Sequence, residues 1–159
     1  MKRDIFIDNN IASKFANPVD PEYKELIKWL MDNHDITEGT DDDRAYLVVS
    51  NKLLKEYLSS SRDAFGATAI PMIINKLTQE NRLVKITNQQ IKDFKSQYFT
   101  KAVENKLQSN SEDRDHIPAV LLSDRKYALT YDANFTYDLE HFRGFTVIVK
   151  SRPEEIPYK

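Results

Sequence analysis

The sequence predicts an α/β protein with a mainly parallel sheet covered by helices, that is, a three-layer α/β/α sandwich. Short apolar runs typical of strands alternate along almost the whole chain with segments whose apolar residues recur at helical spacing. The 159 residues are 40% hydrophobic and 30% charged, which suits one core, so a single domain over residues 1–159 is expected. Only three glycines occur, which argues against a turn-dense β-sandwich or barrel.

The first half of the chain shows the alternation clearly. Residues 4–7 form an apolar, β-rich run that predicts a buried first strand, and residues 46–49 repeat the pattern. Between them, Asp20 is suited to cap a helix and Pro21 to begin it, and apolar residues then recur at 23, 26, 27, 30 and 31. Residues 33–44 are an expected loop. Ser50 is the expected cap of the next helix, whose apolar positions are 53, 54, 57 and 58.

The second half continues in the same way. A helix is expected over about 66–80, with Pro71 in its first turn or at a kink, and a short strand at 83–86. Asn88 is the expected cap of a further helix, residues 101–114 are polar and weakly helical, and residues 117–122 form a compact apolar helix. The remaining strands are expected at 127–130 and 145–149.

Composition excludes several classes of function. The chain has no cysteine, so a disulfide framework, a thiolate metal site and a cysteine nucleophile are all excluded. No run approaches the roughly 18 apolar residues that cross a bilayer, and an acid interrupts the first residues, so a cytoplasmic protein without a membrane partner is expected. The 23 basic and 25 acidic residues give a net charge of −2, so a polyanion would have to be held by a local patch or through metal ions.

Four acidic residues are expected at one edge of the sheet. Asp8 follows the first strand, Asp132 follows the strand at 127–130, Glu56 lies about two turns into the helix after the second strand, and Asp115 begins the helix at 117–122. Each alone is also typical of a helix cap, a turn or a solvated surface acid. Together at the carboxyl ends of parallel strands, they would repel one another without a cation. An oxygen-only cluster favours Mg²⁺ or Mn²⁺, and its natural chemistry is phosphodiester hydrolysis.

Four motifs containing these acids resemble those of PIN-domain nucleases, in the same order. The first is Ile5-Phe6-Ile7-Asp8-Asn9-Asn10, an apolar strand ending in an acid. The second, at 48–57, is a strand followed by a helix bearing Glu56, and the third is Asp115 before the apolar residues 117–119. The fourth is Thr130-Tyr131-Asp132-Ala133-Asn134-Phe135. The resemblance extends from residue 4 to about residue 149.

The resemblance implies a three-layer α/β/α fold and a metal-dependent endoribonuclease. Asp8, Glu56, Asp115 and Asp132 match the positions that would hold one or two Mg²⁺ or Mn²⁺ ions. The expected partner is single-stranded or structured RNA. Many short members of the family are toxins of toxin–antitoxin pairs, so an antitoxin protein and a second copy of the chain are further candidate partners.

Two departures from the family pattern leave alternatives open. Asn134 stands where many members carry another acid, which keeps an inactive or weakly active scaffold that binds RNA or protein as an alternative. Asp113 lies close enough to Asp115 to compete for the third position. A haloacid-dehalogenase-type phosphatase also begins with a strand ending in Asp, but its second Asp, two residues later, is here Asn10.

Polar neighbours of the acids are candidates for orienting the carboxylates or contacting the substrate. They are Asn10, Thr130, Asn134, Lys52 and Arg114. The three histidines lack a partner at metal-ligand spacing, such as a histidine four residues away on one helix, so His116 is expected to have a surface or structural role.

Overall fold

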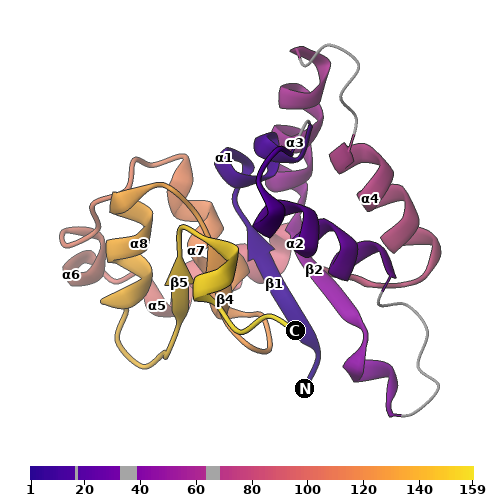
Figure 1. Cartoon of the computed structure of the whole chain (residues 1–159). Coiled ribbons are helices and arrows are strands. Elements are labelled where there is room, and N and C mark those ends of the chain that lie inside the picture. Colours follow the sequence, from indigo (N-terminus) through magenta and orange to yellow (C-terminus); the bar gives the residue numbers. More distant parts are fainter. Residues whose placement is uncertain (17, 33–38, 64–68) are drawn as a thin grey trace.

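Five parallel strands form the centre of the fold (Figure 1). The computed structural model describes residues 1–16, 18–32, 39–63 and 69–159. The strands are β1 (Arg3–Ile7), β2 (Ala45–Ser50), β3 (Leu83–Ile86), β4 (Tyr127–Leu129) and β5 (Ile148–Lys150). Their order in the sheet is β3-β2-β1-β4-β5, and all four neighbouring pairs are parallel.

Helices cover both faces of this sheet. The longer ones are α2 (Pro21–Asp32), α3 (Asn51–Asp63), α4 (Ala69–Gln79), α5 (Asn88–Tyr98) and α8 (Ala133–Glu140). The short ones are α1 (Asn9–Ala12), α6 (Lys101–Glu104) and α7 (His116–Leu121), with 3₁₀ turns η1 (Ser13–Ala16), η2 (Asp41–Asp43), η3 (Asp113–Asp115) and η4 (Pro153–Glu155). Figure 1 shows α2 and α4 on one side of the sheet and α5, α7 and α8 on the other, which confirms the predicted three-layer α/β/α class.

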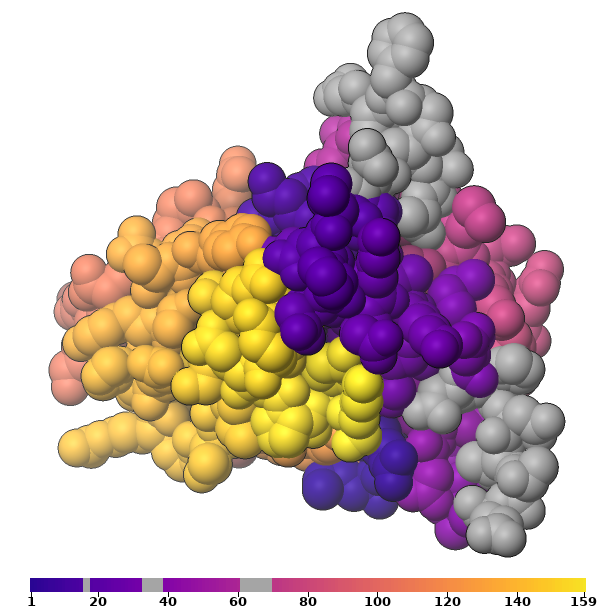
Figure 2. Space-filling view, in the orientation of Figure 1, coloured from indigo at the N-terminus to yellow at the C-terminus, as the bar shows by residue number. Residues whose placement is uncertain are grey.

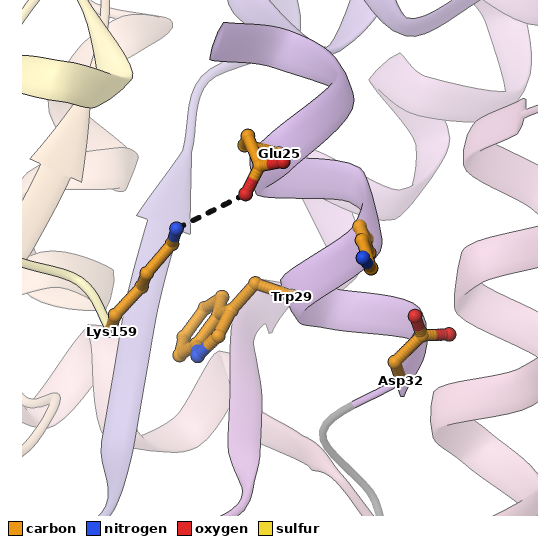
Figure 3. Close-up of a pocket in the computed structure, with 5 residues that line it drawn as sticks. Glu25, Trp29, Asp32 and Lys159 are labelled. Atoms are coloured by element: carbon orange, nitrogen blue, oxygen red, sulfur yellow. Dashed lines mark hydrogen bonds and ion pairs between the residues drawn. The ribbon is translucent and has the colours of Figure 1, made fainter. Parts of the chain in front are cut away.

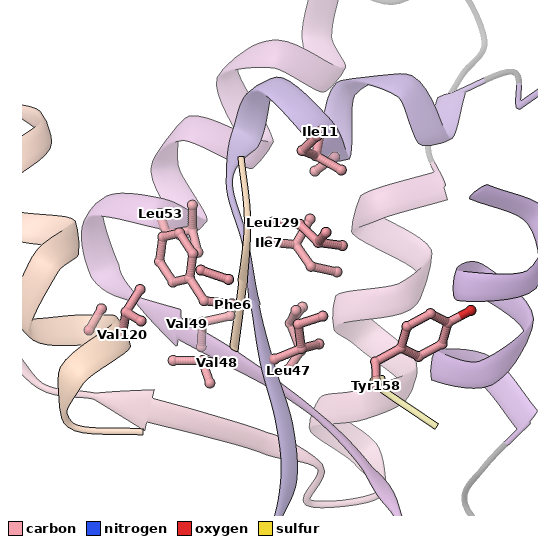
Figure 4. Packing of buried hydrophobic residues seen from close by; sticks show 14 of the residues in the cluster. Phe6, Ile7, Ile11, Leu47, Val48, Val49, Leu53, Val120, Leu129 and Tyr158 are labelled. Carbon is pink, nitrogen blue, oxygen red and sulfur yellow. The ribbon is translucent and has the colours of Figure 1, made fainter. Parts of the chain in front are cut away.

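The sheet is buried on both faces, which explains why its central strands are almost entirely apolar. All six residues of β2 are buried. Successive side chains of a strand point to opposite faces, and Figure 4 places Phe6 and Val120 on one side of the sheet and Leu47 and Tyr158 on the other. Each face therefore has its own layer of packed apolar side chains.

A buried arginine joins α2 to the sheet. Arg82 has no exposed surface, and its guanidinium donates hydrogen bonds to the carbonyl oxygens of Leu30 at 2.7 Å and Ala45 at 3.0 Å. The last carbonyl groups of a helix lack partners within the helix, so the Leu30 bond satisfies one of them. The C-terminal segment also lies against α2 (Figure 2), where the rings of Trp29 and Tyr158 meet edge to face with centroids 5.0 Å apart.

Three sequence expectations differ from the structure. Helix α8 was not expected. The last strand begins at Ile148 rather than at Phe145. The ring of Phe145 instead packs against the rings of Phe94 and Tyr98, with centroids 5.6 and 5.3 Å away. Thr87 rather than Asn88 caps α5, because its hydroxyl accepts the Gln90 N–H at 3.1 Å. Residues 33–38 of the expected loop and residues 64–68, which include the expected start of the third helix at about 66, lie outside the described residues. Within the described ranges, no helix is both long enough and apolar enough to span a membrane.

Candidate functional site

Acidic side chains from separate segments meet at the carboxyl edge of the sheet. Asp8 directly follows β1, and Asp132 follows β4 after two residues. Glu56 comes from α3, the helix that follows β2, and Asp113 comes from η3, just before α7. Ligand sites of parallel α/β sheets usually lie at this edge, because the connecting segments converge there.

Hydrogen bonds hold the carboxylate of Asp8 in one orientation. Its Oδ1 accepts the Asn9 N–H at 2.8 Å, and its Oδ2 accepts the Thr130 hydroxyl at 2.7 Å and the Asn10 side-chain amide at 3.3 Å. Burial raises the pKa of Asp8, while the Thr130 hydrogen bond and the nearby His116 lower it. Asp8 is thus a fixed carboxylate in a poorly solvated place.

Glu56 is brought to Asp8 by contacts of its helix with the end of β1. The hydroxyl of Tyr57, the next residue, donates to the carbonyl oxygen of Ile7, the residue before Asp8. The Asn9 side chain adds a second connection by donating to the Ser60 hydroxyl at 2.6 Å. These bonds fix α3 against α1, so the side chain of Glu56 approaches the acidic edge with 32% of its surface exposed.

A buried histidine meets Glu56 from the other side. His116 begins α7 with 2% of its side chain exposed, and its Nε2 lies 2.8 and 3.1 Å from the two carboxylate oxygens of Glu56. Its Nδ1 is buried without a hydrogen-bond partner. Its ring packs near Phe6 and Phe135, with centroids 5.6 and 6.3 Å away.

Asp113 completes a group with these two residues. One ligand atom each from Glu56, Asp113 and His116 lies within 4.8 Å of the others, close enough to share one metal ion. Partial burial raises the pKa of Asp113, and the carboxylates of Asp132 and Glu56 raise it further. Asp113 is therefore in the electrostatic field of both neighbouring acids.

Asp132 is fixed by the helix that it begins. Its Oδ1 accepts the backbone N–H groups of Asn134 at 2.9 Å and Phe135 at 3.1 Å, so it is the N-cap of α8. Its own N–H donates to the Thr130 hydroxyl oxygen at 3.0 Å. Since the same hydroxyl donates to Asp8, Thr130 connects the two acids through hydrogen bonds.

The structure does not bring Asp115 into this group. Its carboxylate forms an ion pair with Lys95 of α5, and about a third of each side chain is exposed. In a 3₁₀ turn, residues three apart lie above one another, so Asp113 and His116 share a face while Asp115 points elsewhere. The structure thus favours Asp113 as the third acid, the alternative that the sequence left open.

The other polar residues singled out by the sequence are near the acids but make different contacts. Asn10 donates to Asp8 and accepts the Tyr131 N–H at 3.1 Å, in agreement with an orienting role. The ammonium of Lys52 contacts the backbone oxygen of Glu112, whereas Arg114 donates to the Ser109 carbonyl at 3.0 Å and so stabilises its own loop. Asn134 is exposed.

His116 is the residue that the sequence analysis assigned differently. A surface or general structural role was expected because no second histidine stands four residues away. The spacing Asp113-x-x-His116 contains the relevant signal, since a 3₁₀ turn aligns residues i and i+3. A 3₁₀ turn at that position was not recognisable from the sequence pattern.

A hollow of about 230 Å³ lies on α2, and it is lined by none of the acids described above (Figure 3). It is bounded by Trp29 and by side chains of both charges, including Glu25, which accepts a hydrogen bond from the Lys159 ammonium at 3.1 Å. Its charges are paired or mixed in sign, and it contains none of the residues of the acidic edge.

Comparison with known proteins finds no match to this chain among family models, curated proteins or solved structures.

Proposed function

We propose that the protein is a metal-dependent endoribonuclease in which Asp8, Glu56, Asp113 and Asp132 form the acidic centre. The observation that carries the proposal is the grouping of Glu56, Asp113 and His116 within 4.8 Å, beside the carboxylates of Asp8, which accepts the Thr130 hydroxyl, and Asp132, which accepts the N–H groups of Asn134 and Phe135. Acids from four segments gathered at the ligand-binding edge of a parallel sheet repel one another unless a cation is present.

The donor set fits a divalent cation. Carboxylate oxygens are the usual ligands of Mg²⁺ and Mn²⁺, and an imidazole nitrogen is accepted more readily by Mn²⁺ than by Mg²⁺. Glu56, Asp113 and His116 would hold the ion, with Asp8 and Asp132 beside it. The cation would make water a stronger nucleophile and would stabilise negative charge on the phosphate. Because a buried histidine belongs to the group, we expect Mn²⁺ to support more activity than Mg²⁺.

The residues of the chain supply orientation. Thr130 and Asn10 hold the Asp8 carboxylate by donating hydrogen bonds to its Oδ2. Metal-assisted hydrolysis depends steeply on the placement of the reacting groups, and a shift of about 1 Å costs roughly a hundredfold in rate. Side chains already fixed by hydrogen bonds would not have to be ordered when substrate binds.

RNA as substrate is supported by the order of the four PIN-like motifs. The alternative of a haloacid-dehalogenase-type phosphatase needs a second aspartate as general acid, and its position is held by Asn10, whose amide donates to Asp8 and cannot supply that proton. An inactive scaffold remains as the outcome expected if neither RNA nor phosphomonoesters are hydrolysed.

The experiment compares two isosteric variants. Purified protein should cleave single-stranded RNA with Mn²⁺ or Mg²⁺ and should not cleave it with chelator. Asp113→Asn should reduce cleavage by two or more orders of magnitude, because it removes a carboxylate from the cation site. Asp115→Asn loses the same charge two residues away and should still cleave, because its partner is Lys95.

Three results would contradict the proposal in different ways. Cleavage that persists in chelator rules out the metal mechanism. Loss of cleavage in Asp115→Asn with retention in Asp113→Asn returns the third position to Asp115. Hydrolysis of small phosphomonoesters in place of RNA favours the phosphatase.

A further inference from the structure

A groove with several lysines lies next to the acidic centre. It has a volume of about 370 Å³, and its polar lining consists of Lys52 from α3, Asp115 from η3, and Asn88, Lys92, Lys95 and Ser96 from α5. We call it the lysine groove. Clefts of about 300–1,000 Å³ are typical of ligand sites, so a nucleotide-sized group fits this volume.

The charge of the lysine groove is opposite to that of the whole chain. Three lysines face one aspartate there, although acidic residues outnumber basic residues in the sequence by 25 to 23. Lys92 is exposed, and Lys95 keeps 34% of its side chain exposed while it pairs with Asp115 and lies over the Phe99 ring. Cations held in a concave place attract phosphate groups more strongly than isolated surface lysines do.

The lysine groove is continuous with the acidic centre. Lys52 and Glu56 lie one turn apart on the same face of α3, and the positive charge of Lys52 also acts on Asp113. On the opposite wall, Asp115 lies two residues after Asp113 in the same turn. A strand whose phosphate reaches Glu56 and Asp113 would therefore extend into the groove.

We infer that the lysine groove binds the sugar-phosphate backbone of the single-stranded nucleic acid whose cleavage is proposed above. This inference rests on the proposed function for the identity of the site, but not on turnover for its test. Lys52, Lys92 and Lys95 contact successive phosphates, and Asn88 and Ser96 offer hydrogen bonds to phosphate or sugar oxygens. Asp115 pairs with Lys95 and reduces the net positive charge of the groove.

The test measures binding in chelator, where the proposed cleavage does not occur. Fluorescein-labelled single-stranded RNA and DNA of one sequence are titrated with the wild type and with Lys92→Ala/Lys95→Ala over a series of salt concentrations, and anisotropy is followed. Each phosphate contact contributes about 0.7 to the slope of log affinity against log salt, so the double variant should lower the slope by about 1.4. Between about 50 and 200 mM salt the wild type should therefore lose about sevenfold more affinity than the variant.

The matched control is Lys24→Ala/Lys28→Ala, which removes two exposed lysines from α2 on the other side of the sheet (Figure 1). It should keep the wild-type slope, and Asp115→Asn should bind more tightly because it removes the acid of the groove. The inference is overturned if the two double variants lose affinity equally, if the wild type binds neither RNA nor DNA, or if the loss of affinity is confined to RNA. Contacts with the phosphate backbone should affect the binding of both nucleic acids. Absence of Mn²⁺-dependent cleavage with binding still mapped to the groove would count against the proposed function alone.

Discussion

Replacing Asp8 with asparagine should separate the stability of the metal-free protein from its response to metal. Asparagine is nearly isosteric with aspartate and caps helices equally well, so the bond from the Asn9 N–H to position 8 is kept. The side-chain atom that replaces Oδ2 donates rather than accepts, so the bonds from Thr130 and Asn10 are disturbed. Against this loss, a poorly solvated negative charge next to Glu56 is removed.

These effects are of similar size in the metal-free protein. The two disturbed hydrogen bonds cost about 1 kcal/mol each, and relief of a desolvated charge returns about 1–3 kcal/mol, so the free energy of unfolding should change by no more than about 1 kcal/mol in either direction. In the wild type, a cation at a hundredfold excess over its Kd adds about 2.7 kcal/mol, or roughly 5–10 °C in Tm for a chain of this length. A hundredfold weaker affinity in Asp8→Asn would reduce that gain to about 0.4 kcal/mol.

Thermal melts with Mn²⁺ and with chelator measure both quantities. The matched control is Asp20→Asn, because Asp20 accepts the Glu22 N–H at 2.9 Å at the start of α2, pairs with Arg152 at 2.7 Å, and is not one of the residues of the acidic centre. That control should lose stability in both conditions and keep the full shift with Mn²⁺. Asp8→Asn melting well below the wild type in chelator, or shifting with Mn²⁺ as much as the wild type, would refute the reasoning.

Two further predictions concern the contacts that position the acids. Burial raises the pKa of Tyr57 well above its usual 10.0, so the unfolded chain loses this proton at a lower pH than the folded chain. The free energy of unfolding should therefore fall as pH rises above 10, by about 1.4 kcal/mol per pH unit. In urea unfolding, Tyr57→Phe should be less stable than the wild type at pH 8 by about 1 kcal/mol, and it should lose less stability than the wild type between pH 8 and pH 11. A fall as steep as that of the wild type would contradict this. The buried Asp138 accepts the N–H groups of Gln108 and Ser109, both at 2.8 Å. Asp138→Ala should therefore lower the free energy of unfolding, measured in urea, by roughly 1–3 kcal/mol, and it should also slow RNA cleavage because the loop before Asp113 loses its anchor. Unchanged stability would show that water replaces the carboxylate.

The strands and the acids that directly follow them were predictable because the signal is local. Residues 46–49 are an apolar run of strand length within β2, whose six residues are all buried, and a strand buried on both faces needs such a run. The parallel arrangement then places Asp8 and Asp132 at one edge without further information. This part of the site follows from pattern and topology together.

The last strand and the last helix were less predictable because packing between distant segments decides them. Phe145 lies in an apolar run typical of a strand, but its ring joins Phe94, Tyr98 and Phe142, and pairing with β4 begins only at Ile148. In α8, the stripe that faces the core contains only a few buried residues, so its periodicity is weak.

The choice between Asp113 and Asp115 depends on which of them shares a helical face with His116. The apolar residues after Asp115 favour that residue, because they match the third of the motifs that resemble those of PIN-domain nucleases. The 3₁₀ turn at 113–115 instead aligns Asp113 with His116 and leaves Asp115 to Lys95. The first turn of an α-helix would also place residues 113 and 116 on one face, so the deciding observation is the contact of His116 with Glu56, which joins segments far apart in the sequence.

The four acids lie on two sets of segments, each held together by hydrogen bonds, which we call bodies. These hydrogen bonds set the spacing of the acids. Asp8 and Glu56 are joined through the bonds from Tyr57 to Ile7 and from Asn9 to Ser60. Asp113 and Asp132 are joined through α8, since Asp132 caps that helix and Asp138, six residues later, anchors the loop that leads to Asp113.

The Thr130 hydroxyl links the two bodies by donating to Asp8 and accepting the N–H of Asp132. Each body is held mainly by bonds that do not involve the carboxylates of Glu56 and Asp113, so the mutual repulsion of these acids is opposed by the fold itself. A site held in this way does not have to be assembled by its ligand, and the affinity for a cation is not reduced by a cost of ordering. We therefore expect substitutions that remove the hydrogen bonds within and between these two bodies to alter RNA cleavage, even where Asp8, Glu56, Asp113 and Asp132 are all retained.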